Sequence, residues 1–399
     1  MLPEGWSEIA LEDLANVERG KFSARPRNDS KFYNGTTPFV QTGDVSSSDT
    51  YLREYTQTLN DEGVKVSKIF PKGTILVTIA ANIGDSAIAE FDVACPDSVV
   101  GIQCYQEKSN NIWLKFKIDT IKKNLDNEAG KNAQKNINLQ LLKPLKILTP
   151  PLPEQEKIAA VLSTWDKAIS TTDALLANSR QQKKALMQQL LTGKRRLPGF
   201  TGEWKTILLS DIAVRLNERN NGQSDNVVTI SAQKGLVRQE EFFNKSIASE
   251  NLDTYFILHK GQFAYNKSYS IGYPMGAIKR LKLYETGVVT SLYICFDITS
   301  MQADANFYEH FFESGLLNAA LTKIAAEGGR AHGLLNVRPA DFMHISVPLP
   351  PLDEQRAIAA VLDAADREIV LLEQKAARLR EEKKALMQQL LTGKRRVRL

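Results

Sequence analysis

The sequence predicts two mixed α/β regions, each followed by one long helix. The run KKALMQQLLTGKRR at 183–196 returns unchanged at 383–396. Upstream of it, PPLPEQEKIAAVL at 150–162 returns in altered form as PPLDEQRAIAAVL at 350–362. The long blocks ahead of these repeats share only scattered positions. Internal repetition of this kind indicates two copies of one structural unit, each large enough for a core of its own.

The two copies divide the chain into four segments. We expect a first α/β region at 1–150, a central helical region at 151–196, a second α/β region at 197–349 and a distal helical region at 350–399. Runs rich in β-branched and aromatic residues predict buried strands within 73–80, 99–105 and 288–298. Helical stretches are expected near 112–125 and 306–326, whereas the order of the strands stays open.

Both helical regions begin and end on typical helix signals. Pro153 and Glu154 suit a first turn, and Gly193 followed by basic residues suits a helix end. A 4-3 spacing of mainly apolar residues runs from 158 to 190 and, in the same phase, from 358 to 390. Such spacing is typical of a coiled coil, although polar residues interrupt it. At about 1.5 Å per residue, each helix would reach about 55 to 60 Å.

The identical ends of the two helices include polar residues that packing does not require. Cores tolerate apolar substitution, so identity at Lys, Gln and Arg positions indicates two equivalent surfaces that face two copies of one partner. The alternative is a hairpin that merely spaces two domains. The candidate partner-binding residues are Lys183, Lys184, Gln188, Gln189, Lys383, Lys384, Gln388 and Gln389.

The formal net charge of +5 arises in the helical regions. Residues 1–150 carry 18 basic and 19 acidic side chains, and residues 197–349 carry 14 and 15, so neither α/β region is a bulk polycation. Local basic clusters interleaved with Asn and Gln suit phosphate and base-edge contacts, although for any single cluster a solvated surface is the better explanation. The candidate DNA contacts are Lys21, Arg25, Arg27, Gln41, Lys131, Gln134, Lys135, Asn136, Lys234, Arg238, Lys267, Arg330, His332 and Asn336.

Signatures of catalysis and metal binding are absent from the sequence. It has neither a G-x-x-x-x-G-K-[ST] loop nor a G-x-G-x-x-G loop, and its His and Cys residues are not spaced as metal ligands. Three scattered cysteines indicate a reducing compartment. No signal peptide and no apolar run of about 20 residues is found. We therefore expect a cytoplasmic, non-catalytic protein with no metal and no cofactor.

The repeated motifs resemble those of a known family. The chain is similar to the specificity subunits of Type I restriction-modification systems in PPLPEQ and PPLDEQ, both KKALMQQLLTGKRR ends, TPFVQTGDV at 37–45, VRQEEFFNKSIAS at 237–249 and KNAQKNIN at 131–138. The resemblance covers essentially the full chain. It implies that the two α/β regions are target recognition domains, each reading one half of a split, asymmetric sequence in double-stranded DNA.

The resemblance also implies which partners the chain has. The two helices would pair antiparallel as a spacer and dock two modification subunits, which would hold S-adenosylmethionine and methylate adenine. Restriction subunits would join for cleavage. The lack of an N-P-P-Y or D-P-P-Y motif in this sequence agrees. The loops at 131–137 and 329–337 would take equivalent places in the two domains. Rival interpretations are a self-contained methyltransferase or nuclease and a coiled-coil scaffold that binds only protein.

Overall fold

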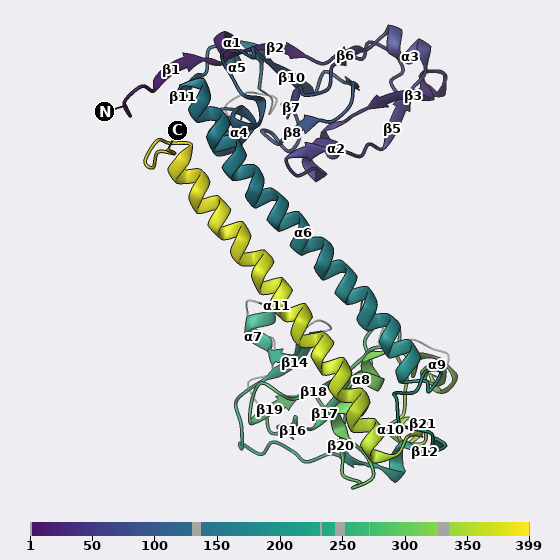
Figure 1. Cartoon of the computed structure of the whole chain (residues 1–399). Helices are drawn as coiled ribbons and strands as arrows, with labels where there is room; N and C mark the ends of the chain where they lie inside the picture. The colour runs from purple at the N-terminus through teal and green to yellow at the C-terminus, as the bar shows by residue number, and fades with distance from the viewer. Residues whose placement is uncertain are drawn as a thin grey trace. The chain divides into compact units, whose positions relative to one another are not determined.

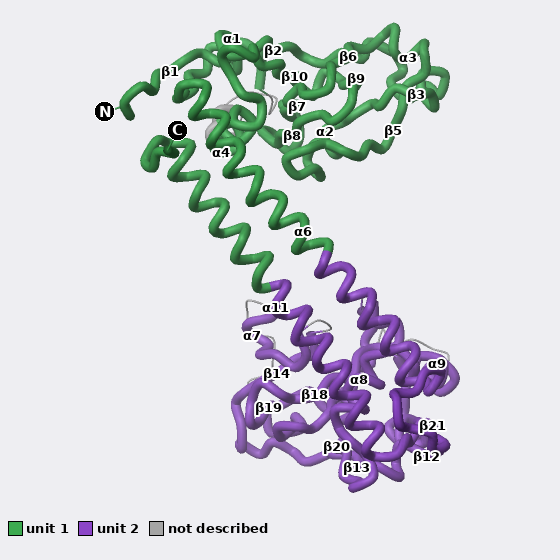
Figure 2. Tube along the Cα trace, viewed as in Figure 1, with its two compact units in different colours: residues 1–174, 374–399 green, residues 175–373 purple. Residues whose placement is uncertain are grey.

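The computed structural model describes residues 2–129, 137–231, 234–243, 252–270, 272–325 and 335–398. The chain forms two compact units, drawn in different colours in Figure 2. Unit 1 comprises Met1–Ala174 and Gln374–Leu399, and unit 2 comprises Leu175–Glu373. Each unit therefore holds one α/β region together with one part of each long helix.

The α/β region of unit 1 is built on a mixed five-stranded sheet of order β2-β10-β7-β8-β4 (Figure 1). A four-stranded sheet of order β5-β3-β9-β6 completes it, and the pair β1-β11 joins the start of the region to its end. Strands β7 and β8 are buried along their whole length, as their apolar composition predicts. The strands are β1 Ser7–Ala10, β2 Ala15–Arg19, β3 Tyr33–Phe39, β4 Tyr51–Leu52, β5 Gln57–Leu59, β6 Lys68–Phe70, β7 Ile75–Thr78, β8 Ser86–Ala89, β9 Val93–Cys95, β10 Val99–Cys104 and β11 Lys146–Thr149.

One longer helix, α4, packs on this sheet. It begins after Asn110, whose side-chain oxygen accepts a hydrogen bond from the Trp113 backbone N–H at 3.0 Å. The inward side chains Trp113 and Phe116 are fully buried. The helices of the region are α1 Leu11–Leu14, α2 Thr42–Ser47, α3 Asp61–Lys65, α4 Asn111–Ala129 and α5 Leu139–Leu142, with the 3-10 turn η1 Ser30–Phe32.

Unit 2 repeats the central part of this plan. Its sheet of order β13-β20-β17-β18 corresponds strand by strand to β2-β10-β7-β8, and β12-β21 corresponds to β1-β11. Two further pairs, β14-β15 and β16-β19, take the place of the second sheet of unit 1. The strands are β12 Lys205–Leu208, β13 Ala213–Leu216, β14 Val228–Ser231, β15 Gly235–Arg238, β16 Phe256–His259, β17 Phe263–Asn266, β18 Ala277–Arg280, β19 Thr286–Val289, β20 Ile294–Ile298 and β21 Ser346–Leu349.

Two stretches of unit 2 differ from the sequence prediction. The apolar run at 288–298 is divided between β19 and β20, which belong to different sheets. The helical stretch near 306–326 is broken at Gly315, whose φ of +76° ends α8 before α9 begins. The helices are α7 Gln239–Phe243, α8 Ala305–Glu313, α9 Asn318–Ile324 and α10 Pro339–Met343, with the 3-10 turn η2 Leu209–Asp211.

The long helices are α6 Leu152–Leu190 and α11 Leu352–Leu390, each of 39 residues. Both helices end before the basic residues at 194–196 and 394–396. Gly193 and Gly393 follow the helices with φ of +68° and +71°, the left-handed conformation that favours glycine after a helix. None of the helices in the described parts of the chain is both long and apolar enough to cross a membrane.

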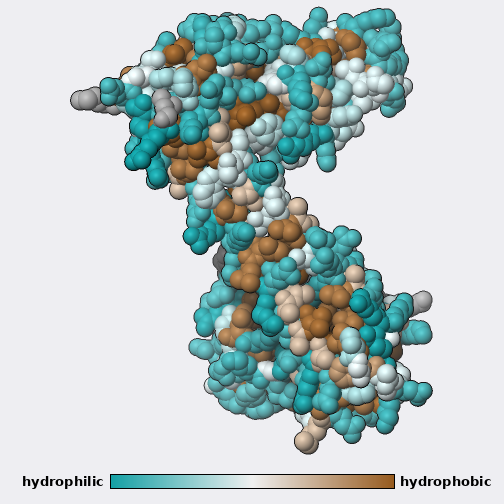
Figure 3. All heavy atoms as spheres, viewed as in Figure 1, coloured by the Kyte–Doolittle hydropathy of each residue, from teal (hydrophilic) through white to brown (hydrophobic). Residues whose placement is uncertain are grey.

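The core of each unit includes the beginning of one long helix and the end of the other. In unit 1, Ile158 and Leu162 of α6 share a cluster with Leu390 of α11 and with Trp113. In unit 2 the helices exchange these roles, because Ile358 and Leu362 of α11 lie in one cluster with Leu190 of α6. Figure 3 also shows hydrophobic residues at the surface of the long helices, where Leu175, Val370 and Leu371 are exposed.

Candidate functional site

The repeated PPL-x-EQ motif supplies a buried carboxylate at the start of each long helix. In unit 1, Glu154 accepts hydrogen bonds from Arg396 Nε at 2.6 Å and Nη2 at 2.8 Å, and from Trp6 Nε1 at 3.1 Å. In unit 2, Glu354 accepts from Arg196 Nε at 2.5 Å and Nη2 at 2.6 Å, and from Trp204 Nε1 at 2.9 Å. Both carboxylates are at most 1% exposed. This arrangement, here called the Glu-Arg-Trp tie, binds each α/β region to both long helices.

The glutamine of the same motif holds the first turn of a helix in the α/β region. Gln155 accepts from the Asn110 backbone N–H at 2.9 Å and donates to the carbonyl oxygens of Lys108 and Pro150. Gln355 does the same in unit 2, where it accepts from the Asp304 N–H at 2.8 Å. The Glu and Gln of this motif therefore make internal contacts in both copies.

Unit 1 has one further tie, which does not recur among the described residues of unit 2. The buried Lys117 of α4 donates from Nζ to the backbone oxygen of Leu391 at 2.7 Å, at the end of α11. Burial lowers the pKa of Lys117, because the ammonium loses hydration that a single carbonyl oxygen replaces in part. Asn110 and Asp304 take equivalent places in the two units, because their backbone N–H groups donate to Gln155 and Gln355. Counted from these two residues, the position of Lys117 in α4 corresponds to that of Phe311 in α8.

Ion pairs link the two long helices at polar positions of the interface between them, here called the seam. In unit 1, Lys383 pairs with Asp166 and Arg380 pairs with Asp173 at 2.6 Å. The corresponding pairs in unit 2 join Lys183 to Asp366 and Arg180 to Glu373, both at 2.5 Å. Every residue in one set lies 200 positions from its counterpart in the other. The helices are therefore antiparallel, and the two lysines that interrupt the apolar spacing make intramolecular contacts.

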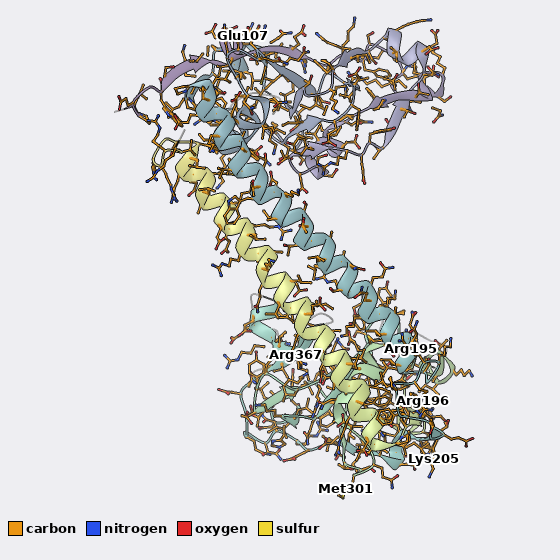
Figure 4. All side chains as sticks on the ribbon, viewed as in Figure 1. Glu107, Arg195, Arg196, Lys205, Met301 and Arg367 are labelled. Carbon is orange, nitrogen blue, oxygen red and sulfur yellow. The ribbon has the colours of Figure 1, made fainter. Side chains whose placement is uncertain are left out.

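The identical helix ends thus divide into inward and outward positions. Lys183 and Lys383 are half-buried and paired, whereas Lys184, Gln188 and Gln189 are exposed. Figure 4 shows Arg195 and Arg196 just beyond the end of α6, where Arg196 enters the Glu-Arg-Trp tie and Arg195 is exposed. The positions exposed in both copies are Lys184, Ala185, Gln188, Gln189, Thr192, Lys194 and Arg195, with Lys384, Ala385, Gln388, Gln389, Thr392, Lys394 and Arg395.

A His-carboxylate cluster joins α8 to α11 in unit 2. The buried His310 lies with Nε2 at 2.9 Å from Asp363 and Nδ1 at 3.9 Å from Asp366. Their ligand-type atoms all lie within 4.8 Å of one another, so the three side chains could hold a divalent ion. Asp366 is already neutralised by the Lys183 ammonium, however, and an ion would have to compete with it. The arrangement is therefore satisfied by contacts within unit 2, the His310–Asp363 hydrogen bond and the Lys183–Asp366 ion pair.

The candidate DNA contacts of unit 1 that the structure describes lie on exposed loops. Lys21, Arg25 and Arg27 follow β2, and Arg27 makes an ion pair with Asp97 at 2.9 Å. Gln41 precedes α2 and donates to the Gln57 side chain. Four candidates, Lys131, Gln134, Lys135 and Asn136, lie outside the described residues.

The structure brings two candidates of unit 2 together. Lys267 donates from Nζ to the Val337 oxygen at 3.4 Å and accepts at its own backbone oxygen from the Leu335 N–H at 3.0 Å, beside Asn336. Lys234 immediately precedes β15 and Arg238 is its last residue. Lys234 lines a cavity of about 580 Å³ with Lys279 and Arg280. Arg330 and His332 lie outside the described residues.

Most of the chain matches one protein family. Residues 3–178 and 203–381 match the family described as Type I restriction modification DNA specificity domain. In Methanocaldococcus jannaschii, the protein named "Putative type I restriction enzyme MjaX specificity subunit" is 26% identical, with 99% of this chain and 95% of that protein covered. The MjaVIII specificity subunit of the same organism is 21% identical, with 99% and 94% covered.

Two solved structures share the fold. The S subunit of a Type-I restriction-modification system from M. genitalium has a TM-score of 0.61 at 15% identity, covering 98% of this chain and 99% of that one. The HsdS subunit from Thermoanaerobacter tengcongensis has a TM-score of 0.52 at 17% identity, covering 98% of both chains.

Proposed function

This chain belongs to the family of Type I restriction-modification specificity subunits, and we propose that its two α/β regions each read one half of a split, asymmetric sequence in double-stranded DNA. Residues 1–150 and 197–349 are the target recognition domains in this proposal. Residues 151–196 and 350–399 form the helical regions that connect them and set the spacing of the two half-sites.

The observation that carries the proposal is a repeated scaffold that holds two different surfaces. The helix contacts of one unit recur in the other at an offset of 200 residues, as in Asp166 with Lys383 and Asp366 with Lys183. The attached regions have diverged, so that one is completed by a four-stranded sheet and the other by two strand pairs. A common scaffold that holds unlike surfaces fits a DNA site whose halves differ, because base contacts carry the sequence information.

The exposed part of the identical helix ends supports docking of two modification subunits. Internal packing explains the identity of inward residues such as Lys183 and Arg196. It does not explain the identity of exposed residues such as Gln188 and Gln189. Two equivalent outward surfaces would receive two copies of one partner. In this proposal the modification subunits hold S-adenosylmethionine and methylate adenine, and restriction subunits join for cleavage.

Charge supports a division of labour between this chain and its partners. Each α/β region has about as many acidic as basic side chains, so the chain alone would release few counterions on DNA. Tight, sequence-specific binding should therefore appear when modification subunits add their contacts. A nanomolar sequence-specific complex of the isolated chain at physiological salt would contradict this part of the proposal.

The proposal is tested by expressing the chain with its modification subunit and mapping methylated adenines across a genome. A bipartite, asymmetric motif with a fixed gap is expected. Methylation without a split motif would overturn the proposal, and methyl transfer by the isolated chain would favour the self-contained enzyme. Partner binding with no change in DNA protection would favour the protein-only scaffold.

Docking is tested separately by Gln188→Glu with Gln189→Glu, which leaves the second helix end intact. Native mass spectrometry should then show one bound modification subunit instead of two. The matched control is Gln182→Glu, because Gln182 is exposed, lies just before the identical run and corresponds to a glutamate, Glu382, in the other copy. Two bound subunits in both variants would place the docking surface elsewhere.

A further inference from the structure

We propose that the loop between β7 and β8, residues 79–85, and the described parts of the loop between β17 and β18, residues 267–270 and 272–276, are the equivalent base-reading elements of the two recognition domains. Asn82 presents the reading side chain of the first loop and Tyr269 that of the second. The inference rests on the proposed function and adds to it the positions that read the two half-sites. The strands involved are labelled in Figure 1.

The first loop is held rigidly by a buried hydroxyl. Thr78 is fully buried, and its Oγ1 donates to the Asn82 backbone oxygen at 2.6 Å and accepts from the Asp85 N–H at 3.1 Å. The Gly84 N–H donates to the Thr78 oxygen at 2.9 Å. Ile83 points inward and is buried, so Ala81 and Asn82 are the side chains that the loop exposes.

The backbone at the tip of this loop is strained. Ala81 has φ of +49° and Asn82 has φ of +47°. The left-handed conformation disfavours a residue such as alanine, whereas asparagine tolerates it better. Backbone strain of this kind persists where surrounding contacts enforce it, and it concentrates at functional sites. The enforced conformation here delivers an exposed amide, and an amide can pair with the major-groove edge of an adenine.

The second loop has the same place in its sheet and a different exposed side chain. The buried Tyr265 donates from its hydroxyl to the Met275 oxygen at 2.7 Å, and Gly276 with φ of +77° closes the loop against Asn266. At the tip, Ser270 and Tyr273 exchange backbone hydrogen bonds of 3.3 and 2.8 Å. Tyr269 beside Ser270 is 63% exposed, which is high for a large aromatic side chain.

Each loop also anchors the segment that returns from the helical side of its domain. The Ile137 N–H donates to the Ile79 oxygen at 3.0 Å in unit 1. In unit 2 the Leu335 N–H donates to the Lys267 oxygen, also at 3.0 Å. The anchoring is therefore repeated although the exposed residues are not. The two loops are thus held in the same way, but one exposes an amide and the other a phenol. Two domains that read different bases need this combination.

The test is the methylation specificity of the assembled complex. Asn82→Ala should relax the preference at one or two base pairs of one half-site by roughly tenfold or more, with the other half-site unchanged. Tyr269→Ala should do the same in the opposite half-site. The matched controls are Asn16→Ala, an exposed asparagine on β2, and Leu283→Ala, an exposed apolar residue of unit 2, and neither should change the motif.

Asn82→Asp provides a second variant, because aspartate also tolerates the left-handed backbone and replaces the amide donor by an acceptor. It should shift the preferred base while the melting temperature stays within a few degrees of wild type. A wild-type motif in all three variants, or an equal loss of methylation on every sequence, would overturn the inference. Failure of the wild-type complex to show any split motif would instead refute the proposed function.

Discussion

The Glu-Arg-Trp tie predicts a large and local loss of stability on Glu354→Gln. The substitution keeps the shape of the side chain but turns one acceptor oxygen into an amide donor. Glu354 is fully buried and accepts three hydrogen bonds, two from Arg196 and one from Trp204. The new amide group would face an N–H donor that has no other acceptor in the tie.

The magnitude follows from the burial of the two partners. Breaking a buried ion pair costs about 3 to 5 kcal/mol. The Arg196 side chain is 26% exposed and can recover part of its hydration, so we expect about 2 to 4 kcal/mol. The loss should fall on unit 2, which contains all three side chains. The corresponding Glu154→Gln should weaken unit 1 by a similar amount.

Hydrogen exchange at increasing urea, read by mass spectrometry, reports each unit separately. The matched control is Asp353→Asn, the neighbouring carboxylate, which is 88% exposed and lies 3.9 Å from Arg356. We expect the control to change stability by less than about 0.5 kcal/mol. A loss below about 1 kcal/mol for Glu354→Gln, or an equal loss of protection in both units, would refute the reasoning.

Three further predictions concern other parts of the molecule. The pKa of Lys117 in the folded state is lowered from its ordinary value of 10.5. Between these two values the unfolded state binds more protons than the folded state, so the free energy of unfolding of unit 1 should rise with pH in that window. Lys117→Met should flatten the rise in urea titrations at several pH values, and an unchanged slope would count against it. Burial raises the pKa of Cys104 to about 11, so about one thousandth of this thiol is ionised at pH 8. Because the thiolate is the reactive form, iodoacetamide should label Cys104 only after unfolding. Labelling of the folded protein at the rate of free cysteine would be inconsistent with its burial. One heptad inserted after Leu176 and another after Ala376 should lengthen both helices by about 10 Å between the ion pairs Asp173–Arg380 and Arg180–Glu373. Methylation mapping should then find the half-sites about three base pairs further apart, with the bases of each half-site unchanged. An unchanged gap would show that the helices do not set the spacing.

The sequence was informative where structure is local or repeated. The strand run at 99–105 corresponds to β10, and the 4-3 spacing identified helices that extend over 39 residues each. Repetition indicated two units of one architecture, and the strand orders of the two central sheets agree with it. The run at 288–298 was wrong as one strand, because the polar pair Thr290 and Ser291 within it belongs to the turn between β19 and β20 and was not recognised as a break.

Long-range partners were beyond sequence reasoning. Glu154 fits the first turn of a helix as an exposed acid, but its partner Arg396 lies 242 residues away and encloses it with Trp6. The sequence predicts Lys183 as a partner-binding residue, but its side chain instead pairs with Asp366 of the other long helix. The one available signal was the motif itself, because Glu, Gln and the terminal Arg recur together at an offset of 200 residues. The strained loop at 79–85 had no such signal, since its left-handed backbone depends on the buried Thr78.

The division into units has a consequence for the order in which the chain can fold during synthesis. Unit 2 is one continuous stretch, whereas unit 1 needs Gln374–Leu399 to complete its core. Trp113, Ile158 and Leu162 leave the ribosome long before Leu390 and Leu391 cover them. The first domain to be translated is thus the last to be finished, and until then its apolar surface stays open to chaperones. A chain released after Glu373 should have a closed second unit and an unfinished first one.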